Sequence, residues 1–259
     1  SCKKWGVAAS EALVVDIASN DGCLLRSFQQ EGFQRVMGVE PAINIASIAM
    51  QAGIPTINKF WGIESAKEIL NREGPANLVT ATNVFAHVDD IGSFVTCVEL
   101  LLEEDGIFVL EVPYAFDLIA HQEWDTIYHE HLSYFLLKPL VQHFEAHRLK
   151  VFHVERVPIH GGSLRLYVQK SSCRKRGVQN SVKNILETEA KSRLYDLALY
   201  NGFAQKVLET RKALSHFFEE TVLAGKKVVG FGATAKGNTL LNYCGIGPQQ
   251  ISFIVDDTP

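Results

Sequence analysis

Apolar and polar residues along the first half of the chain alternate between short strand-like runs and longer helical ones. Strands are predicted at Leu13–Ile17, Arg35–Glu40, Pro55–Asn58, Leu78–Thr82 and Gly106–Val112. Helices are predicted from near Cys23, over Ile43–Ala52, over Glu64–Asn71 and over Gly92–Leu102. Strands that alternate with helices in this way predict a parallel sheet with helices wound on both faces.

The second half of the chain changes its pattern twice. After a helix at Pro139–His147, the runs Val151–Val157 and Ser163–Gln169 flank Pro158–Gly162, which predicts an antiparallel hairpin appended to the sheet. Helical periodicity then extends over 178–223, and core packing is the expected role of its apolar stripe. From Lys226 a strand, a glycine loop and a helix follow, with another strand at Ile251–Val255.

These changes predict three parts: a first domain over 1–170, a helical connector over 171–225, and the start of a second domain over 226–259. A single strand–helix–strand unit cannot form a stable sheet, since three or more strands are generally needed. We therefore expect the second domain to be truncated at residue 259.

Composition narrows the class of protein. Of the 259 residues, 47% are hydrophobic and 21% are charged, which is typical of a globular chain, and the net charge of −4 argues against a nucleic-acid binder. No apolar run reaches the length of a membrane span, and the first residues lack the pattern of a signal peptide. The five cysteines are dispersed without a Cys-x-x-Cys pair, so we expect reduced thiols, a cytoplasmic setting and no zinc site.

The loop after the first strand has the chemistry of a ligand site. Ala18-Ser-Asn-Asp-Gly22 joins a strand to a helix, so that backbone N–H groups and a helix N-terminus can face a ligand. Glu40 ends the second strand about 20 residues later, where a carboxylate can bind both hydroxyls of a ribose. Asp16 and the Asn-Asp pair suit an amino-acid ammonium better than a pyrophosphate. The alternative is a plain strand–helix turn with a surface glutamate.

Two further groups of polar residues follow strand ends. Asn83, Phe85 and His87 come after one strand, and Glu111, Pro113 and Tyr114 lie at the end of another. Ligands of such sheets bind at the carboxyl ends of the strands, so both groups are expected to face the crevice of the first loop. His87 has the alternative of a packed, neutral histidine.

A dense cluster of chemically active side chains occupies Thr126–Phe135. Tyr128, Glu130 and His131 could supply an oxyanion donor, an orienting carboxylate and a general base that titrates near neutral pH. The alternative is a polar helix start whose aromatic rings are packed and whose histidines are solvated.

A second glycine loop lies near the end of the sequence. Gly230, Gly232 and Gly237 leave room for a pyrophosphate, and Lys236 could add a cation.

Six motifs occur together in one order along the chain. They are Asp16–Leu25, Gly38–Pro41, Asn83–Asp90, Tyr128–Phe135, His160–Arg165 and Gly232–Asn238. In this combination the chain resembles the sugar C-methyltransferases, which use S-adenosylmethionine to methylate a carbon of a nucleotide-linked keto-sugar, typically C3 of a dTDP-4-keto-deoxyhexose. The resemblance implies a doubly wound, Rossmann-like class I methyltransferase sheet, a long helical segment and a second, partial Rossmann-like domain.

The sequence departs from that family in two places. Ala18 stands where the family usually has the first glycine of the loop, which a small residue tolerates if its backbone angle is ordinary. The cysteine-rich zinc-binding segment with which such proteins usually begin is not seen here, so no metal is expected in the chain as given.

The resemblance also implies roles for individual residues. His131 is the expected base for the C3 proton, Tyr128 and Glu130 hold the sugar and the developing oxyanion, and His129 is structural. The expected S-adenosylmethionine contacts are Asp16, Ala18, Ser19, Asn20, Asp21, Gly22, Glu40, Pro41, Phe60, Asn83, Val84, Phe85 and His87. The expected contacts of the nucleotide-diphosphate sugar are Tyr114, His160, Gly161, Gly162, Ser163, Arg165, Gly232, Ala233, Lys236 and Asn238.

Two other classes of function stay open at this point. A nicotinamide-dependent, NAD(P)-linked oxidoreductase of sugar nucleotides also fits two glycine loops that are each followed by an acid. A non-catalytic sugar-nucleotide binder could be built on the same fold. The nucleotide base, the stereochemistry of the sugar and the oligomeric state are left open as well.

Overall fold

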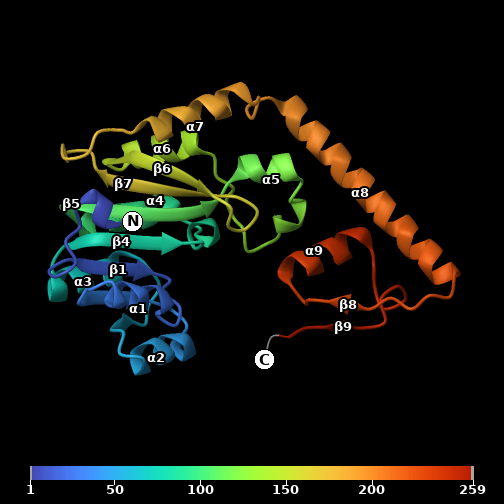
Figure 1. Ribbon diagram of the computed structural model, residues 1–259, viewed down its shortest axis with the longest axis horizontal. Coiled ribbons are helices and arrows are strands. Elements are labelled where there is room, and N and C mark those ends of the chain that lie inside the picture. The colour runs from blue at the N-terminus through green and yellow to red at the C-terminus, as the bar shows by residue number, and fades with distance from the viewer. Residues whose placement is uncertain (1, 258–259) are drawn as a thin grey trace. The chain divides into compact units, whose positions relative to one another are not determined.

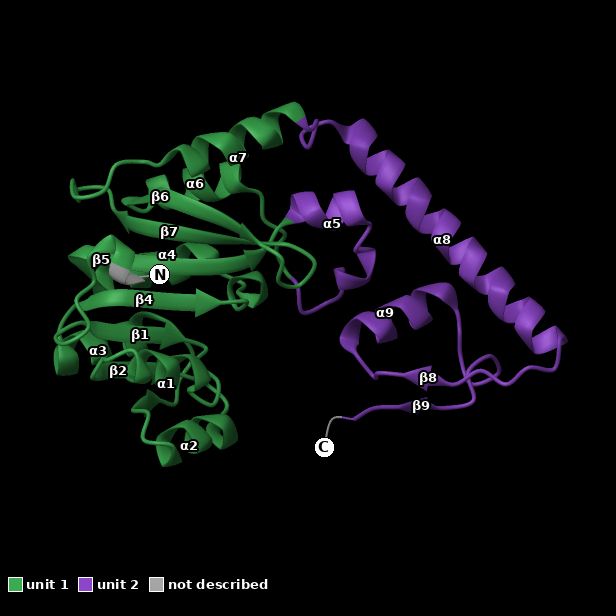
Figure 2. Ribbon diagram, in the orientation of Figure 1, with its two compact units in different colours: residues 1–114, 132–191 green, residues 115–131, 192–259 purple. Residues whose placement is uncertain are grey.

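The computed structural model describes residues 2–257, and the chain divides into two compact units. Unit 1 combines residues 1–114 and 132–191, whereas unit 2 combines residues 115–131 and 192–259 (Figure 2). Each unit is therefore built from two separate stretches of sequence.

Unit 1 contains a seven-stranded sheet in the order β3-β2-β1-β4-β5-β7-β6 (Figure 1). Its strands are β1 (Leu13–Ile17), β2 (Arg35–Val39), β3 (Thr56–Ile57), β4 (Ala76–Thr82), β5 (Leu102–Pro113), β6 (Leu149–Val157) and β7 (Ser163–Lys170). The pairs from β3 to β5 are parallel, and β7 runs antiparallel to both β5 and β6. This is the class I methyltransferase arrangement, so the predicted fold class and the appended hairpin are confirmed.

The helices of unit 1 connect these strands at the places where the sequence predicts them. They are α1 (Cys23–Gln30), α2 (Ile43–Gln51), α3 (Ile63–Glu73), α4 (Ile91–Leu101), α6 (Leu137–Ala146) and α7 (Asn180–Lys191), with short 3-10 helices η1 (Cys2–Trp5) and η2 (Phe85–His87). Asp90 directly precedes helix α4, and its carboxylate caps the helix by accepting a hydrogen bond from the Ser93 amide at 2.8 Å. Connections of this length keep consecutive strands parallel.

The register of the sheet places polar side chains in two rows on one face. Asp16 pairs with Thr80, Thr80 pairs with Val109, and Val109 pairs with Tyr167. One step further along the strands, Thr82 pairs with Glu111 and Glu111 pairs with Arg165. Because side chains two residues apart point to the same face of a strand, both rows lie on the same side of the sheet.

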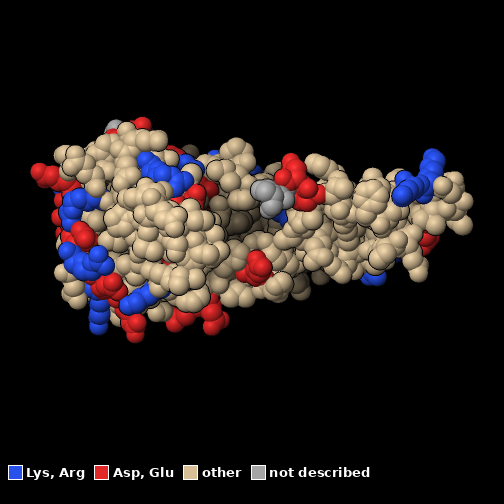
Figure 3. Space-filling model, turned by 90° about the horizontal axis from the view of Figure 1, so that it is seen from below, with Lys and Arg blue, Asp and Glu red and all other residues tan. Residues whose placement is uncertain are grey.

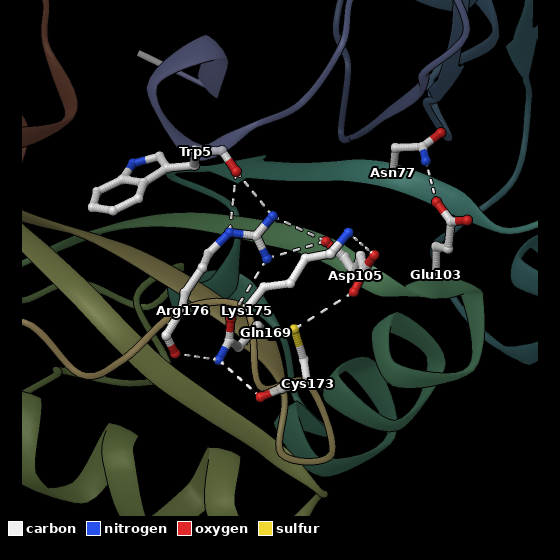
Figure 4. Close-up of polar contacts among 8 residues, drawn as sticks. All are labelled: Trp5, Asn77, Glu103, Asp105, Gln169, Cys173, Lys175 and Arg176. Carbon is white, nitrogen blue, oxygen red and sulfur yellow. Dashed lines mark hydrogen bonds and ion pairs between the residues drawn. The ribbon is translucent and has the colours of Figure 1, made fainter.

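A single guanidinium fastens the N-terminal segment to the sheet (Figure 4). Arg176 donates to the Trp5 carbonyl at 3.0 and 3.2 Å and to the Asp105 carbonyl at 3.1 Å. Its charge also lies over the Phe152 ring. Three segments far apart in sequence are joined in this way.

Unit 2 has its own small core. Its elements are α5 (Ala115–His121), η3 (Trp124–Thr126), α8 (Leu197–Leu223), β8 (Gly230–Phe231), α9 (Ala235–Cys244) and β9 (Ile254–Val255). Trp124 packs with Val207, Phe218, Cys244 and Ile246. Strands β8 and β9 form a parallel pair that is shorter than the predicted strands.

The helical stretch predicted over 178–223 is divided in two. Arg193 adopts a left-handed backbone angle, with φ of 60°, and Asp196 caps α8 by accepting a hydrogen bond from the Ala198 amide at 2.9 Å. Helix α7 therefore ends in unit 1, and α8 begins in unit 2.

Charge is mixed on the surface that Figure 3 draws. Acidic and basic side chains are interspersed there among larger uncharged areas. Between residues 2 and 257, none of the helices combines the length and the apolar character that crossing a membrane would require.

Candidate functional site

The loop after β1 takes an unusual backbone path. Ala18, Asn20 and Gly22 have φ angles of 56°, 52° and 78°, all in the left-handed region. The condition under which alanine would replace the family's glycine without cost, an ordinary backbone angle, is therefore not met at Ala18. Left-handed geometry costs an L-residue roughly 1–2 kcal/mol, and the strain lies where the predicted ligand site begins.

Glu40 binds this loop directly. One carboxylate oxygen accepts from the Asn20 amide at 3.1 Å, and the other accepts from the Ala42 amide at 2.9 Å. Its side chain is buried. Because each carboxylate oxygen has two lone pairs, both oxygens can accept one further hydrogen bond.

Asp16 is a buried acid on the neighbouring strand. Its carboxylate accepts a hydrogen bond from Thr80 Oγ1 at 2.6 Å. Burial raises the pKa of Asp16 to about 7, and the Thr80 hydrogen bond opposes this shift only in part. Near neutral pH this group can therefore gain or lose a proton, or take a cationic partner.

Two cavities are lined in part by residues of this loop. Cavity A, about 500 Å³ in volume, is lined by Ile17, Ala18, Val39, Pro41, Phe60, Trp61, Val84, His87, Val88, Asp89, Asp90, Ser93 and Phe94. Phe60 is 81% exposed, whereas the Trp61 indole donates to the Phe94 carbonyl at 3.2 Å. Cavity A thus offers aromatic surface that a flat ring could cover.

Cavity B is more polar and has a volume of about 940 Å³. Its lining is Asp16, Ala18, Ser19, Asn20, Asp21, Cys23, Leu24, Ser27, Phe28, Thr80, Thr82, Val109, Glu111, Ile159, Arg165 and Tyr167. It lies on the sheet face that carries the two polar rows. Ala18 lines both cavities, so they adjoin at this residue.

The segment after β4 divides its predicted residues between the cavity and the core. Val84 and His87 line cavity A, and His87 is exposed, so the alternative of a packed histidine is wrong. Phe85 is fully buried, stacks on Phe135 at 5.2 Å between ring centroids, and lines neither cavity. Asn83 has a φ of 54°, and its buried Oδ1 has no hydrogen-bond partner among the described residues.

The hairpin turn crosses the end of β5. His160, Gly161 and Gly162 all have positive φ angles, and the Gly162 carbonyl accepts from the Tyr114 amide at 2.9 Å. Ser163 is fully buried and donates to the Ile159 carbonyl at 2.9 Å. Ile159 and Arg165 line cavity B, so the turn brings part of the predicted substrate set to this cavity.

Tyr114 points into the interior instead. It is 2% exposed, and its hydroxyl donates to Glu189 at 3.0 Å. Glu189 also accepts from the backbone amides of Leu137 at 2.5 Å and Lys138 at 3.0 Å, at the start of α6. In this structure Tyr114 helps to join β5, α6 and α7.

The central cluster forms a tight turn within unit 2. His131 Nδ1 lies 2.7 Å from the Thr126 carbonyl, and the hydroxyl of Tyr128 lies 3.4 Å from His131 Nε2. A carbonyl only accepts, so Nδ1 carries the proton and Nε2 presents a lone pair in the neutral ring. Burial, with a contribution from Glu130, raises the pKa of Tyr128 and keeps its hydroxyl protonated. His129 and Glu130 are exposed.

The glycine loop of unit 2 repeats the arrangement of the first loop. The Ala233 amide donates to Asp256 at 2.5 Å, as the Asn20 amide does to Glu40 in unit 1. Thr234 caps α9 by accepting from the Gly237 amide at 3.0 Å. Lys236 and Asn238 follow in the first turn of α9.

Sequence reasoning missed two residues of the site. Thr80, the partner of Asp16, is a polar residue within an apolar strand, and that irregularity could have marked it. Trp61 follows Phe60 directly, and the aromatic pair before a helix was a weaker signal. Groups of three or more metal-ligating side chains are not found within residues 2–257.

Known protein families match both halves of the chain. Residues 5–154 match a methyltransferase domain, and residues 158–259 match the C-methyltransferase C-terminal domain. The chain is 38% identical over 246 residues to C-methyltransferase NovU of Streptomyces niveus, a match that covers 95% of this chain and 58% of that relative. The chain therefore spans less than two thirds of the relative's length.

Solved structures share the fold at low sequence identity. An S-adenosylmethionine-dependent methyltransferase from Mesorhizobium loti has a TM-score of 0.51 and 12% identity, covering 65% of this chain and 95% of that chain. A methyltransferase in complex with the Haloferax volcanii Trm112 methyltransferase activator has a TM-score of 0.52 and 14% identity, covering 63% of this chain and 84% of that chain.

Proposed function

Because the chain belongs to the methyltransferase-domain family and joins that domain to a C-methyltransferase C-terminal domain, we propose that the protein transfers a methyl group from S-adenosylmethionine to a carbon of a nucleotide-linked keto-sugar. The six motifs favour C3 of a 4-keto-deoxyhexose. Family membership supports the reaction type, and the motif set supports the substrate.

The observation that carries this proposal is the pair of cavities that adjoin at Ala18. A ligand lying across the loop would place one end against Phe60 and Trp61, and the other against Asp16. S-adenosylmethionine has an aromatic base at one end and an ammonium at the other, which matches this division of apolar and acidic surface.

Three residues hold the cofactor in this scheme. Phe60 stacks on the adenine, the remaining lone pairs of Glu40 accept the ribose hydroxyls, and Asp16 accepts the ammonium in its charged form. The backbone of 18–22, together with Val84 and His87, completes the site. A bound S-adenosylmethionine supplies an electrophilic methyl group on a positively charged sulfur.

The chain's own residues supply the proton chemistry. We assign the removal of the C3 proton to His131 Nε2, since the hydrogen bond of Nδ1 to Thr126 leaves Nε2 as the acceptor. The electrons of that C–H bond form an enolate, whose oxygen takes a hydrogen bond from Tyr128 with Glu130 helping to hold the sugar. C3 then forms its bond to the methyl carbon as the bond from methyl to sulfur breaks.

The remaining substrate contacts follow the same motifs. The turn 160–163 and Arg165 flank cavity B. Gly232, Ala233, Lys236 and Asn238 are assigned to the diphosphate or sugar, since Lys236 is a cation in the first turn of α9.

Calorimetry with S-adenosylhomocysteine and with NAD tests the cofactor assignment. S-adenosylhomocysteine should bind the chain and NAD should not. Phe60→Ala should weaken S-adenosylhomocysteine binding by about 5- to 150-fold, since stacking on a base contributes about 1–3 kcal/mol. The matched control is Phe231→Ala, another exposed phenylalanine, in unit 2. Binding of NAD in place of S-adenosylhomocysteine would favour the oxidoreductase.

Deuterium exchange in the full-length protein tests the base. With S-adenosylhomocysteine bound to block methyl transfer, the parent should exchange the C3 proton of a keto-sugar nucleotide with heavy water. His131→Ala should lose about 100- to 10,000-fold of that rate, and Tyr128→Phe should lose less. Exchange at the parent rate in His131→Ala would assign the base to another residue, with His87 or Glu130 next.

A further inference from the structure

Glu111 is a buried acid with only one of its two oxygens engaged. It lies near the end of β5 and is 4% exposed. Arg165 Nε and Nη2 both donate to the same oxygen, Oε2, at 2.9 and 2.7 Å. Within residues 2–257, Oε1 receives no hydrogen bond, although Glu111 lines cavity B.

A carboxylate oxygen in such a place calls for a donor from a ligand. A carboxylate can accept about four hydrogen bonds, so Oε1 has capacity left for a donor from a ligand that enters cavity B. Cavity B, at about 940 Å³, has room for a sugar ring next to this oxygen.

The charges around Glu111 restrict the kind of ligand. Register places Thr82, Glu111, Arg165 and Glu155 in one row across four strands. Arg165 Nη1 also lies 3.8 Å from Glu155, which in turn accepts from the Tyr167 hydroxyl at 3.2 Å. One guanidinium therefore stands between two carboxylates, so this row carries a net negative charge and repels phosphate.

We propose that Glu111 binds a ring hydroxyl of the sugar through Oε1, and that Arg165 is the positioning residue that holds this carboxylate rather than a ligand of the diphosphate. The proposal rests on the keto-sugar function stated above and adds a residue that selects for a hydroxylated sugar. The diphosphate then binds elsewhere, away from this acidic row.

The test compares two substrates in variants of the full-length protein. The substrates are a dTDP-linked 4-keto-6-deoxyhexose and its counterpart that lacks the 2-hydroxyl. Glu111→Gln should raise KM for the hydroxylated sugar about ten- to a hundredfold, the range of a charged hydrogen bond. The same variant should change KM for the deoxy sugar and the affinity for S-adenosylhomocysteine less than about twofold.

Two further variants test whether Arg165 binds the diphosphate or instead positions the Glu111 carboxylate. Glu155→Gln removes the other carboxylate beside Arg165 without touching cavity B, and it should leave the preference between the two sugars unchanged. Arg165→Lys keeps the charge but cannot donate the two hydrogen bonds that Nε and Nη2 give to Glu111 Oε2. This variant should lower the preference for the hydroxylated sugar without weakening dTDP binding. If dTDP binding fell in Arg165→Lys, Arg165 would be a phosphate ligand and the proposal would be overturned.

The remaining outcomes distinguish this inference from the function on which it rests. Equal losses on both sugars in Glu111→Gln, or losses on neither, would overturn the role of Glu111 while leaving the methyltransferase intact. A parent protein that bound S-adenosylhomocysteine but neither sugar would overturn the keto-sugar function, and this inference with it.

Discussion

Residue 38 must be a glycine because Ser19 occupies the space that a side chain at this position would need. A methyl group at residue 38 would lie 2.4 Å from Ser19 Oγ and 3.0 Å from Ser19 Cβ. Ser19 belongs to the loop after β1, and its amide donates to the Val39 carbonyl at 3.1 Å. This contact sets the distance between the loop and β2.

Gly38→Ala should therefore destabilise the fold by about 1–3 kcal/mol, the cost of overpacking. The measurement is the free energy of unfolding in urea. Ser19→Gly removes the obstructing atoms, so the double variant should lose much less than the sum of the single variants. Additive losses would show that the steric conflict lies with other neighbours.

At Ala18 the reverse substitution, from alanine to glycine, should stabilise the fold. At a φ of 56° glycine avoids the penalty that alanine bears, so Ala18→Gly should stabilise unit 1 by up to about 1 kcal/mol. The control is Ala52→Gly, where φ is −78° and glycine only adds freedom to the unfolded chain. That variant should lose about 0.5–1 kcal/mol in urea unfolding. Equal losses in both variants would contradict the strain at Ala18.

The pKa of Asp16 predicts a dependence of stability on pH. Folding raises this pKa from 3.8 to about 7, so between these values the native state holds a proton that the unfolded state has released. Stability from this group is therefore complete below pH 3.8 and is lost as pH rises toward 7, by about 1.4 kcal/mol per pH unit.

Asp16→Asn keeps the shape and removes the titration. From pH 5 to pH 7 the free energy of unfolding of the variant should rise relative to that of the parent, with no further change above about pH 8. Urea unfolding at each pH provides the comparison. Parallel curves would contradict the raised pKa.

Spacing along the sequence was enough to predict some residues of the site but not others. Asp16 and Glu40 follow a strand–loop–helix pattern whose geometry is nearly fixed by the fold. Thr80 and the open oxygen of Glu111 depend on register between strands far apart in sequence. The strain at Ala18 could not be predicted, because alanine rarely adopts a positive φ.

At the scale of elements, strongly patterned segments were predicted best. Strand β1 has the predicted bounds, and the hairpin β6–β7 pairs as expected. The break between α7 and α8 was not predicted, since apolar periodicity continues through it while Asp196 caps a new helix. Strands β8 and β9 are shorter than predicted, because a pair of strands has no neighbours to extend its ladder.

Arg176 is expected to matter more than its position in a loop suggests. Arg176→Met keeps an aliphatic stem but leaves the Trp5 and Asp105 carbonyls without their donor, which should cost about 1–3 kcal/mol in urea unfolding. Lys175→Met is the neighbouring control. Lys175 is exposed, and among residues 2–257 its ion-pair partner is the exposed side chain of Asp105, so its loss should stay below about 1 kcal/mol. Similar losses in both would contradict the role of Arg176.

At the scale of the whole molecule, Trp124 joins two distant parts of the sequence into one core. Trp124→Ala should remove about 3–5 kcal/mol from the stability of unit 2. Hydrogen exchange should then become faster in α8 and α9, while the strands β1, β4 and β5 of unit 1 keep their protection. Unchanged exchange in α9 would show that Trp124 is not central to that core.

The discontinuity of unit 2 also has a consequence for synthesis of the chain. Trp124 is translated about 120 residues before Cys244, one of the residues that bury it. At a translation rate of roughly 5–20 residues per second, about 6–24 s pass before Cys244 is synthesised, and the large apolar side chain of Trp124 lacks that contact during this interval. During that interval the nascent segment 115–131, which contains Trp124, exposes apolar surface that a chaperone can bind or that can aggregate.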